Sequence, residues 1–183
     1  MSKSGAYTIE EHQHRVAAWA ASRGASASPL CRFRVETGVA ILEAAGFSSD
    51  LTHPRQLPTP DELDKIHRKW RKRAIRVASG KGLEFSHGIA AKLINSYLKV
   101  RFVCAGHHKH DNAKNLHPPI DALLLKALGD ENVGGFSSDW RRFHNMRWSK
   151  FSSEEYEAVI DLIRRAIPGR PLWVIEQYWQ GHQ

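Results

Sequence analysis

Lys92 and Asp121 are the two residues whose types and surroundings best suit chemistry at an electrophilic carbon. Lys92 lies early in a mostly apolar stretch, and Asn95, Ser96 and Lys99 share its face at helical spacing. Burial and a neighbouring cation both lower the pKa of a lysine, which leaves a free amine that can attack carbon. A lysine that only extends its amine to solvent explains the same spacing.

Asp121 follows two prolines at the start of a leucine-rich segment. The helix dipole at such a position favours a charged carboxylate. A carboxylate held in this way can stabilise an oxocarbenium-like transition state or orient a water molecule. An aspartate that only stabilises the first turn of its helix is the alternative.

These residues belong to a recognisable pattern. The stretch Gly88-Ile89-Ala90-Ala91-Lys92-Leu93-Ile94-Asn95-Ser96-Tyr97-Leu98, followed by Pro119-Ile120-Asp121, resembles the catalytic core of the helix-hairpin-helix DNA glycosylases. By position, the resemblance makes Lys92 the Schiff-base lysine of the bifunctional members and Asp121 the general catalytic carboxylate. It also makes Gly88 the first glycine of the hairpin and Asn95 the asparagine of the following helix.

The resemblance implies an enzyme that flips a damaged or modified base out of double-stranded DNA, or takes it from a single strand, and cleaves its N-glycosidic bond. Strand cleavage by β-elimination follows if Lys92 forms a Schiff base. The base is a repair lesion or a hypermodified base of phage DNA, and in the second case the enzyme acts in defence. Aromatic candidates for contacting the base are Trp140, Trp148 and Phe151, with Trp173 and Trp179 near the C-terminus.

The positive charge of the chain is concentrated in one segment. The 27 Lys and Arg residues exceed the 19 Asp and Glu residues by 27 − 19 = 8, and residues 65–81 alone contain eight basic side chains and no acidic one. Apolar residues recur there at helical spacing, so a helix buries one stripe and presents the cations elsewhere. We expect DNA to contact this region and the start of the next helix through Lys69, Lys72, Arg73, Arg76, Lys81, His87, Gly88 and Asn95. A solvated basic face is the alternative.

A second cluster of polar residues suggests metal chemistry. It contains Cys104, His107, His108, His110, Asp111, Asn115 and His117. Such side chains suit zinc or the core of a metal-dependent nuclease. No strand pattern flanks them, whereas a His-Asn-His nuclease needs a ββα unit, so we expect a polar loop and no metal site. A nuclease and a non-catalytic nucleic-acid-binding protein remain the two alternatives to a glycosylase.

The spacing of apolar residues predicts an all-α protein of about eight helices with a helix-hairpin-helix-like element. We expect one domain over residues 1–183, in one lobe or in two with the cleft between them. The predicted helices start near Thr8, Pro29, Pro60, Ser86, Asp121, Ser138, Ser153 and Pro171. The first should turn Val16, Trp19 and Ala20 inward, the second should include Phe33, and the fourth should be the buried central helix.

Composition limits the cellular context. The longest apolar runs are too short to cross a membrane, and two cysteines are too few for a disulfide framework. The chain has no iron–sulfur cysteine set, so no cofactor is expected. We therefore expect a monomer in the cytoplasm whose partner is DNA.

Overall fold

A computed structural model describes residues 6–26 and 31–181, and over these residues every regular element is a helix. The prediction of an all-α fold is confirmed. The α-helices are α1 (Ile9–Ala25), α2 (Val35–Ala45), α3 (Pro60–Ser79), α4 (His87–Leu98), α5 (Asp111–Lys114), α6 (Ala122–Asp130), α7 (Ser137–Met146) and α8 (Ser153–Ala166). Shorter segments are η1 (Pro54–Gln56), η2 (Lys99–His107, a π-helix that continues α4), η3 (Val133–Gly135), η4 (Trp148–Lys150) and η5 (Leu172–Tyr178). No helix in these ranges is both long and apolar enough to span a membrane.

Local capping signals set most of the helix starts. The side chain of Thr8 accepts a hydrogen bond from the backbone of α1, and Thr59 and Ser152 form capping boxes at α3 and α8. The second helix differs from the prediction. It begins at Val35, so Phe33 precedes it, and the predicted start at Pro29 lies outside the described residues.

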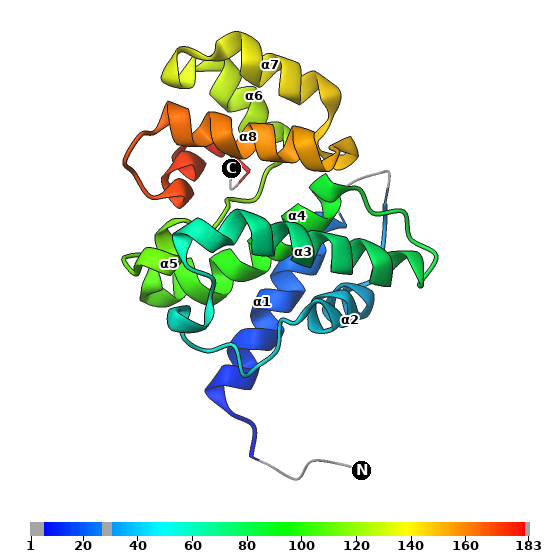
Figure 1. Ribbon diagram of the computed structural model, residues 1–183. Helices are drawn as coiled ribbons and strands as arrows, with labels where there is room; N and C mark the ends of the chain where they lie inside the picture. Colours follow the sequence, from blue (N-terminus) through cyan, green and yellow to red (C-terminus); the bar gives the residue numbers. More distant parts are fainter. Residues whose placement is uncertain (1–5, 27–30, 182–183) are drawn as a thin grey trace.

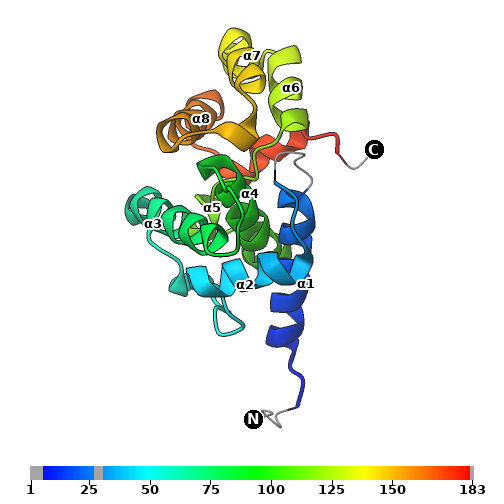
Figure 2. The ribbon, with the colours of Figure 1, turned by 90° about the vertical axis from the view of Figure 1, so that its right-hand side faces the viewer.

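The helices form two groups (Figures 1 and 2). Helices α1 to α5 make up one group, and α6, α7 and α8 stand together on its upper side in Figure 1. Helix α4 is the centre of the larger group, since it contacts α1, α2 and α3, and it also contacts η4 and α8 of the other group. Nearly all of its residues are buried, as the apolar pattern predicted. The segment η5 returns from α8 and contacts α6, which brings the C-terminal part of the chain to the junction of the two groups.

The inward face of α1 differs from the prediction. Val16 and Trp19 are 44% and 56% exposed, and Ala20 is only half-buried. Apart from His14, the buried residues of α1 are all small, namely Ala17, Ala18, Ala21, Ser22 and Ala25. Small side chains let α1 pack closely on α4, which larger residues at the same positions would prevent. Hydrophobicity alone favoured the wrong face because alanine contributes little to an apolar pattern.

Candidate active site

Lys92 and Asp121 meet at the junction of the two helix groups. The ammonium nitrogen Nζ of Lys92 lies 3.1 Å from Oδ2 of Asp121, and the two side chains are only 11% and 15% exposed. Lys92 comes from the second turn of α4, whereas Asp121 is the N-cap residue of α6. The fold therefore brings together the two residues that sequence reasoning had selected separately.

Three donors hold the carboxylate of Asp121. Its Oδ1 accepts the backbone N–H of Leu124 at 2.9 Å, which is the N-cap hydrogen bond of α6. Its Oδ2 accepts from Lys92 and also from the indole Nε1 of Trp179, at 3.1 Å each. The contact with Leu124 is local to α6, whereas Lys92 and Trp179 come from two other parts of the fold, so tertiary contacts fix the position of Oδ2.

Two indole rings enclose the pair. The Nζ of Lys92 lies 4.6 Å from the centre of the Trp148 ring, a distance at which the ring face attracts a cation. Trp179 contacts Asp121 through its N–H, and the Nζ of Lys99 lies 5.6 Å from the centre of its ring. Trp148 was among the aromatic residues predicted to contact a base. Trp179 had been only a further candidate, because no spacing signal links the C-terminal segment to Asp121.

A second ion pair adjoins the first. Lys99, at the junction of α4 and η2, pairs with Glu176 of η5. Burial raises the pKa of the Glu176 carboxyl, the positive charge of Lys99 opposes this change, and the negative charge of Asp121 adds to it. Glu176 is thus electrostatically coupled to the candidate site, and sequence reasoning had missed it.

A hollow of about 610 Å³ opens beside this second pair. Lys99, Val103, Cys104 and His108 line it from η2 and the following residues, and Arg170, Trp173, Val174, Glu176 and Gln177 line it from the opposite side. Four of these nine side chains are apolar, namely Val103, Cys104, Trp173 and Val174, and the others are polar or charged. That combination is common in sites that bind planar organic molecules.

Two of the residues predicted to contact DNA, Asn95 and His87, are not exposed on the surface. Asn95 is fully buried, and its side chain bonds to His67, Tyr156 and the carbonyl of Pro118, so it faces the interior and not the solvent. His87 is half-buried, and its Nδ1 lies 3.3 Å from the guanidinium of Arg71. Burial and the cation Arg71 lower the pKa of His87.

Gly88 lies inside the first turn of α4, and a helix-hairpin-helix element is not confirmed. A Cβ atom at Gly88 would stand 1.8 Å from the carbonyl oxygen of Trp148. The glycine is required by this close approach of η4 to α4. It therefore helps to seat Trp148 beside Lys92.

Trp140 and Phe151, the other predicted base contacts, are core residues. Trp140 is fully buried and donates its indole N–H to the carbonyl of Val133 at 2.9 Å. Phe151 is 1% exposed and packs its ring on Phe143. Of the three aromatic residues predicted for the base, only Trp148 reaches Lys92.

The exposed cations of α3 lie away from Lys92. Its buried residues, Leu63, His67, Arg71, Ala74 and Ala78, form one face of the helix. Lys65, Lys69, Lys72 and Arg76 are exposed and, at their helical spacing, form the opposite face. Two other predicted contacts are also exposed: Arg73, which reaches back to the carbonyl of Ala45, and Lys81, in the turn after α3. The helix α3 thus separates the basic face from α4.

The histidines of the predicted metal cluster do not converge on one point, although His107 and His110 both pack against the ring of His53, with ring centres 5.8 Å and 6.0 Å from it. His110 caps α5 through its Nδ1, His108 packs its ring edge on Trp173, and His117 is buried beside Tyr156. Within residues 6–26 and 31–181, no three His, Cys, Asp or Glu side chains are grouped closely enough to hold a metal ion.

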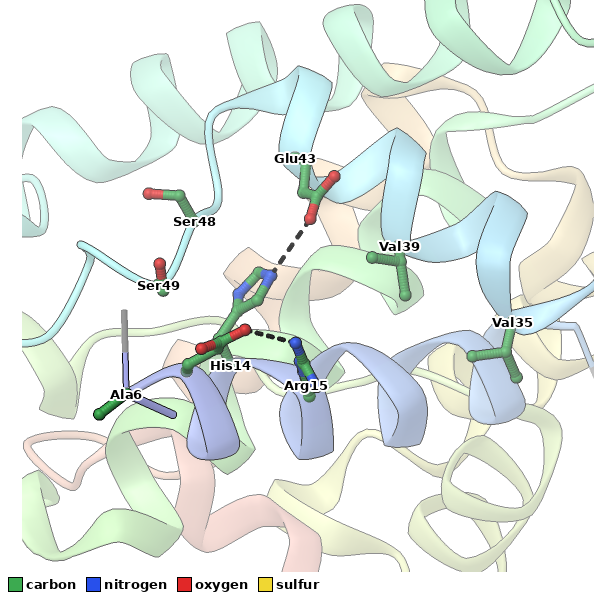
Figure 3. Close-up of a pocket in the computed structure, with 9 residues that line it drawn as sticks. Ala6, His14, Arg15, Val35, Val39, Glu43, Ser48 and Ser49 are labelled. Carbon is green, nitrogen blue, oxygen red and sulfur yellow. Dashed lines mark hydrogen bonds and ion pairs between the residues drawn. The ribbon is translucent and has the colours of Figure 1, made fainter. Parts of the chain in front are cut away.

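Another hollow, of about 730 Å³, lies between α1 and α2 (Figure 3). Its polar side chains are largely paired with one another: Arg15 binds Glu11, and His14 lies 3.6 Å from Glu43. None of Lys92, Asp121, Trp148 and Trp179 lines it, and neither does Lys99 or Glu176, the ion pair that adjoins the candidate site and lines the first hollow. The chemistry of the candidate site therefore has no direct connection with this hollow.

Comparison of the chain with protein-family models, with curated proteins and with solved structures finds no match. The functional argument therefore depends on the geometry of the site.

Proposed function

We propose that this protein is a DNA glycosylase, with Asp121 as the carboxylate that stabilises the sugar and Lys92 as a candidate nucleophile. The observation that carries the proposal is the contact of Lys92 with Asp121 in a nearly closed, indole-lined site. An amine and a carboxylate in contact are the two groups that cleavage of an N-glycosidic bond with Schiff-base formation requires. The resemblance of the surrounding sequence to helix-hairpin-helix glycosylases supports the same function.

Each step can be assigned to a group. The bond between C1′ and the base nitrogen breaks, its electron pair leaves with the base, and the base takes up a proton. The positive charge that develops on C1′ and the ring oxygen is stabilised by the carboxylate of Asp121. Attack by water then gives an abasic sugar and releases one proton.

Attack by Lys92 gives a different product. The ammonium must first lose a proton, and Asp121 lies at hydrogen-bond distance to accept it. The amine then bonds to C1′ in place of the base. The C1′–O4′ bond breaks as a proton moves from Nζ to O4′, which opens the sugar ring and leaves a protonated Schiff base between Nζ and C1′. Loss of a proton from C2′ expels the 3′ phosphate and cleaves the strand by β-elimination.

The hollow beside Lys99 and Glu176 is a suitable place for the base. Lys99 follows Lys92 by two helical turns, which corresponds to about 10 Å along the helix axis. A base attached to a sugar at Lys92 and Asp121 extends over that distance. Glu176 and Lys99 can present a hydrogen-bond acceptor and a hydrogen-bond donor, respectively, to the base.

Base excision by purified protein tests the proposal. Duplexes that carry oxidised, deaminated, alkylated or hypermodified bases are incubated with the protein and then treated with alkali, which cleaves abasic sites. We expect product on at least one substrate and a loss of about 10²- to 10⁴-fold in Asp121→Asn, since asparagine keeps the N-cap hydrogen bond but not the charge. Undiminished excision by Asp121→Asn would exclude Asp121 from the chemistry, and absence of product on all substrates would exclude the function.

Lys92 is tested separately by borohydride reduction during the reaction. A Schiff base to Lys92 gives a covalent protein–DNA adduct that is absent in Lys92→Ala. If Lys92→Ala is trapped equally well, another amine is the nucleophile. If no adduct forms but the base is released, water is the nucleophile and Lys92 has an electrostatic role.

A further inference from the structure

We propose that Asn95 is a positioning residue, which fixes the segment that carries Asp121 against the helix that carries Lys92. Asn95 lies one turn after Lys92 on α4, and its Nδ2 donates to the carbonyl oxygen of Pro118 at 3.0 Å. Pro118 precedes Asp121 by three residues. One side-chain amide thus joins the two halves of the candidate site.

The linked segment is stiff enough to transmit this contact. Pro118 and Pro119 have restricted φ angles and no backbone N–H, so this stretch has few hydrogen bonds of its own. Ile120 is 3% exposed and anchors the next residue in the core. A displacement at Pro118 is therefore passed on to Asp121, with little flexibility between them.

A buried chain of hydrogen bonds fixes the amide of Asn95. Its Oδ1 accepts from Nε2 of His67 at 2.7 Å, and its Nδ2 also donates to the hydroxyl of Tyr156 at 2.9 Å. His67 must donate through Nε2, which leaves its Nδ1 as a bare acceptor. This assignment agrees with the finding that the buried Nδ1 has no hydrogen-bond partner among the described residues.

The chain continues from Tyr156 to a carboxylate. The hydroxyl of Tyr156 lies 2.9 Å from Nδ1 of His117, and Nε2 of His117 lies 2.9 Å from Oδ1 of Asp64. Because a carboxylate only accepts, Nε2 donates to Asp64, and Nδ1 then accepts the proton of the Tyr156 hydroxyl. Arg164 lies 3.5 Å from the same Nε2, but both are donors, and Arg164 binds Asp64 at 2.7 Å.

The hydrogen bonds of this network all run in the same direction. His67 donates to Asn95, Asn95 to Tyr156, Tyr156 to His117, and His117 to Asp64. The residues come from α3, α4, α8 and the segment before Asp121. Each link between neighbouring members of this buried network is a hydrogen bond of 2.7 to 2.9 Å, and such a network favours one arrangement of the elements that it joins. It therefore specifies the separation of Lys92 and Asp121.

The rate at which the Lys92 amine is chemically labelled reports its contact with Asp121, and the measurement needs no DNA. Reductive methylation with formaldehyde and cyanoborohydride, followed by peptide mass spectrometry, gives the labelling rate of Lys92 relative to the exposed Lys69 in the same molecule. We expect this ratio to rise about fivefold in Asn95→Ala, the factor that corresponds to the loss of one hydrogen bond. Tyr156→Phe should give a smaller rise, because Asn95 keeps its bond to Pro118.

Trp140→Phe is the matched control. It removes one buried hydrogen bond, between Trp140 of α7 and Val133 of η3, whereas Asn95→Ala removes three, and it should leave the ratio unchanged. An unchanged ratio in Asn95→Ala, or an equal rise in Trp140→Phe, overturns the proposal. If Asn95→Ala does not fold, an unchanged ratio in Tyr156→Phe overturns it.

The consequence for catalysis depends on the proposed glycosylase function, but the labelling ratio does not. A protein that shows the Asn95 effect on Lys92 and excises no base would refute the function and retain the positioning role. A protein that excises a base, but whose Lys92 labelling is unchanged in Asn95→Ala, would retain the function and refute the positioning role.

Discussion

The indole N–H of Trp179 and the ammonium of Lys92 bind the same carboxylate oxygen of Asp121, each at 3.1 Å. One donor comes from the central helix α4 and the other from the residue that follows η5. Because both occupy Oδ2, the C-terminal segment takes part directly in orienting the carboxylate. The proposed chemistry therefore depends on residues near both the middle and the end of the chain.

Replacement of Trp179 by Phe should weaken the site with little effect on the fold. The ring is retained, but the donor to Asp121 is lost, which we expect to cost about 1 kcal/mol and to reduce base excision about fivefold. Steady-state excision rates and urea unfolding measure the two effects. Trp19→Phe is the control, because Trp19 of α1 is 56% exposed and does not line the hollow proposed for the base. Equal losses in both variants would contradict this role of Trp179.

Addition of a methyl group at Gly88 should disturb Trp148. The Cβ atom would stand 1.8 Å from the Trp148 carbonyl oxygen, and backbone cannot move aside as a flexible side chain can. We expect Gly88→Ala to lower the free energy of unfolding by about 3 kcal/mol. Chemical denaturation measures this value.

Gly24→Ala provides the control for Gly88. Its Cβ would meet only the Ser96 hydroxyl at 3.8 Å, so the substitution in α1 should be neutral or should stabilise by about 0.5 kcal/mol. A tolerated Gly88→Ala would mean that η4 can move away from α4.

The free energy of unfolding should decrease as the pH is lowered below about 6.5. Burial, the largest cause, lowers the pKa values of His67 and His117 in the folded protein, and the unfolded residues titrate near 6.5. Above that pH both states are neutral at these residues and stability is complete. As the pH falls, only the unfolded chain takes up protons, so each histidine lowers the free energy of unfolding by up to about 1.4 kcal/mol per pH unit until the folded pKa is reached.

Urea unfolding between pH 7.5 and 5.5 measures this dependence. The slope should decrease in His67→Gln and remain unchanged in His12→Gln, since His12 is exposed. Asp64 does not confuse the measurement, because its pKa is lowered and its titration lies far below this range. Stability independent of pH over this range would mean that the buried imidazoles are not held neutral.

The basic face of α3 should govern DNA affinity but not the chemical step. Replacement of Lys69 and Lys72 by Ala should weaken binding to all sequences alike, and each lost phosphate contact should reduce the slope of log K against log salt by about one. Fluorescence anisotropy at several salt concentrations measures the slope. Single-turnover excision at saturating protein should stay unchanged.

Arg68→Ala is the control for the basic face. This side chain already pairs with Glu157, so its loss should affect DNA affinity less than the loss of either lysine. Unaltered affinity in the double lysine variant would place the DNA on another face of the protein.

Local patterns in the sequence were sufficient for most of the helices and for the choice of the two central candidates, but not for the start of α2 or for α5, which lies in the segment predicted as a polar loop. Caps such as Thr8 and Ser152, and the apolar period of α4, act within a few residues, so their consequences can be derived before the fold is known. Lys92 and Asp121 were recognisable because a lysine in an apolar helix and an aspartate after two prolines are locally unusual. The structure brings the two side chains into contact, and their chemical role stays a prediction.

Only the tertiary structure decided which faces and which distant residues meet. A side chain at helical spacing has the same sequence pattern whether its face is buried or exposed, so Asn95 was expected at DNA and lies in the core, while Trp19 was expected in the core and is exposed. The approach of Trp179 to Asp121 depends on how η5 packs between the helix groups. Such contacts join segments far apart in the chain, and their energies arise from packing that no local pattern encodes.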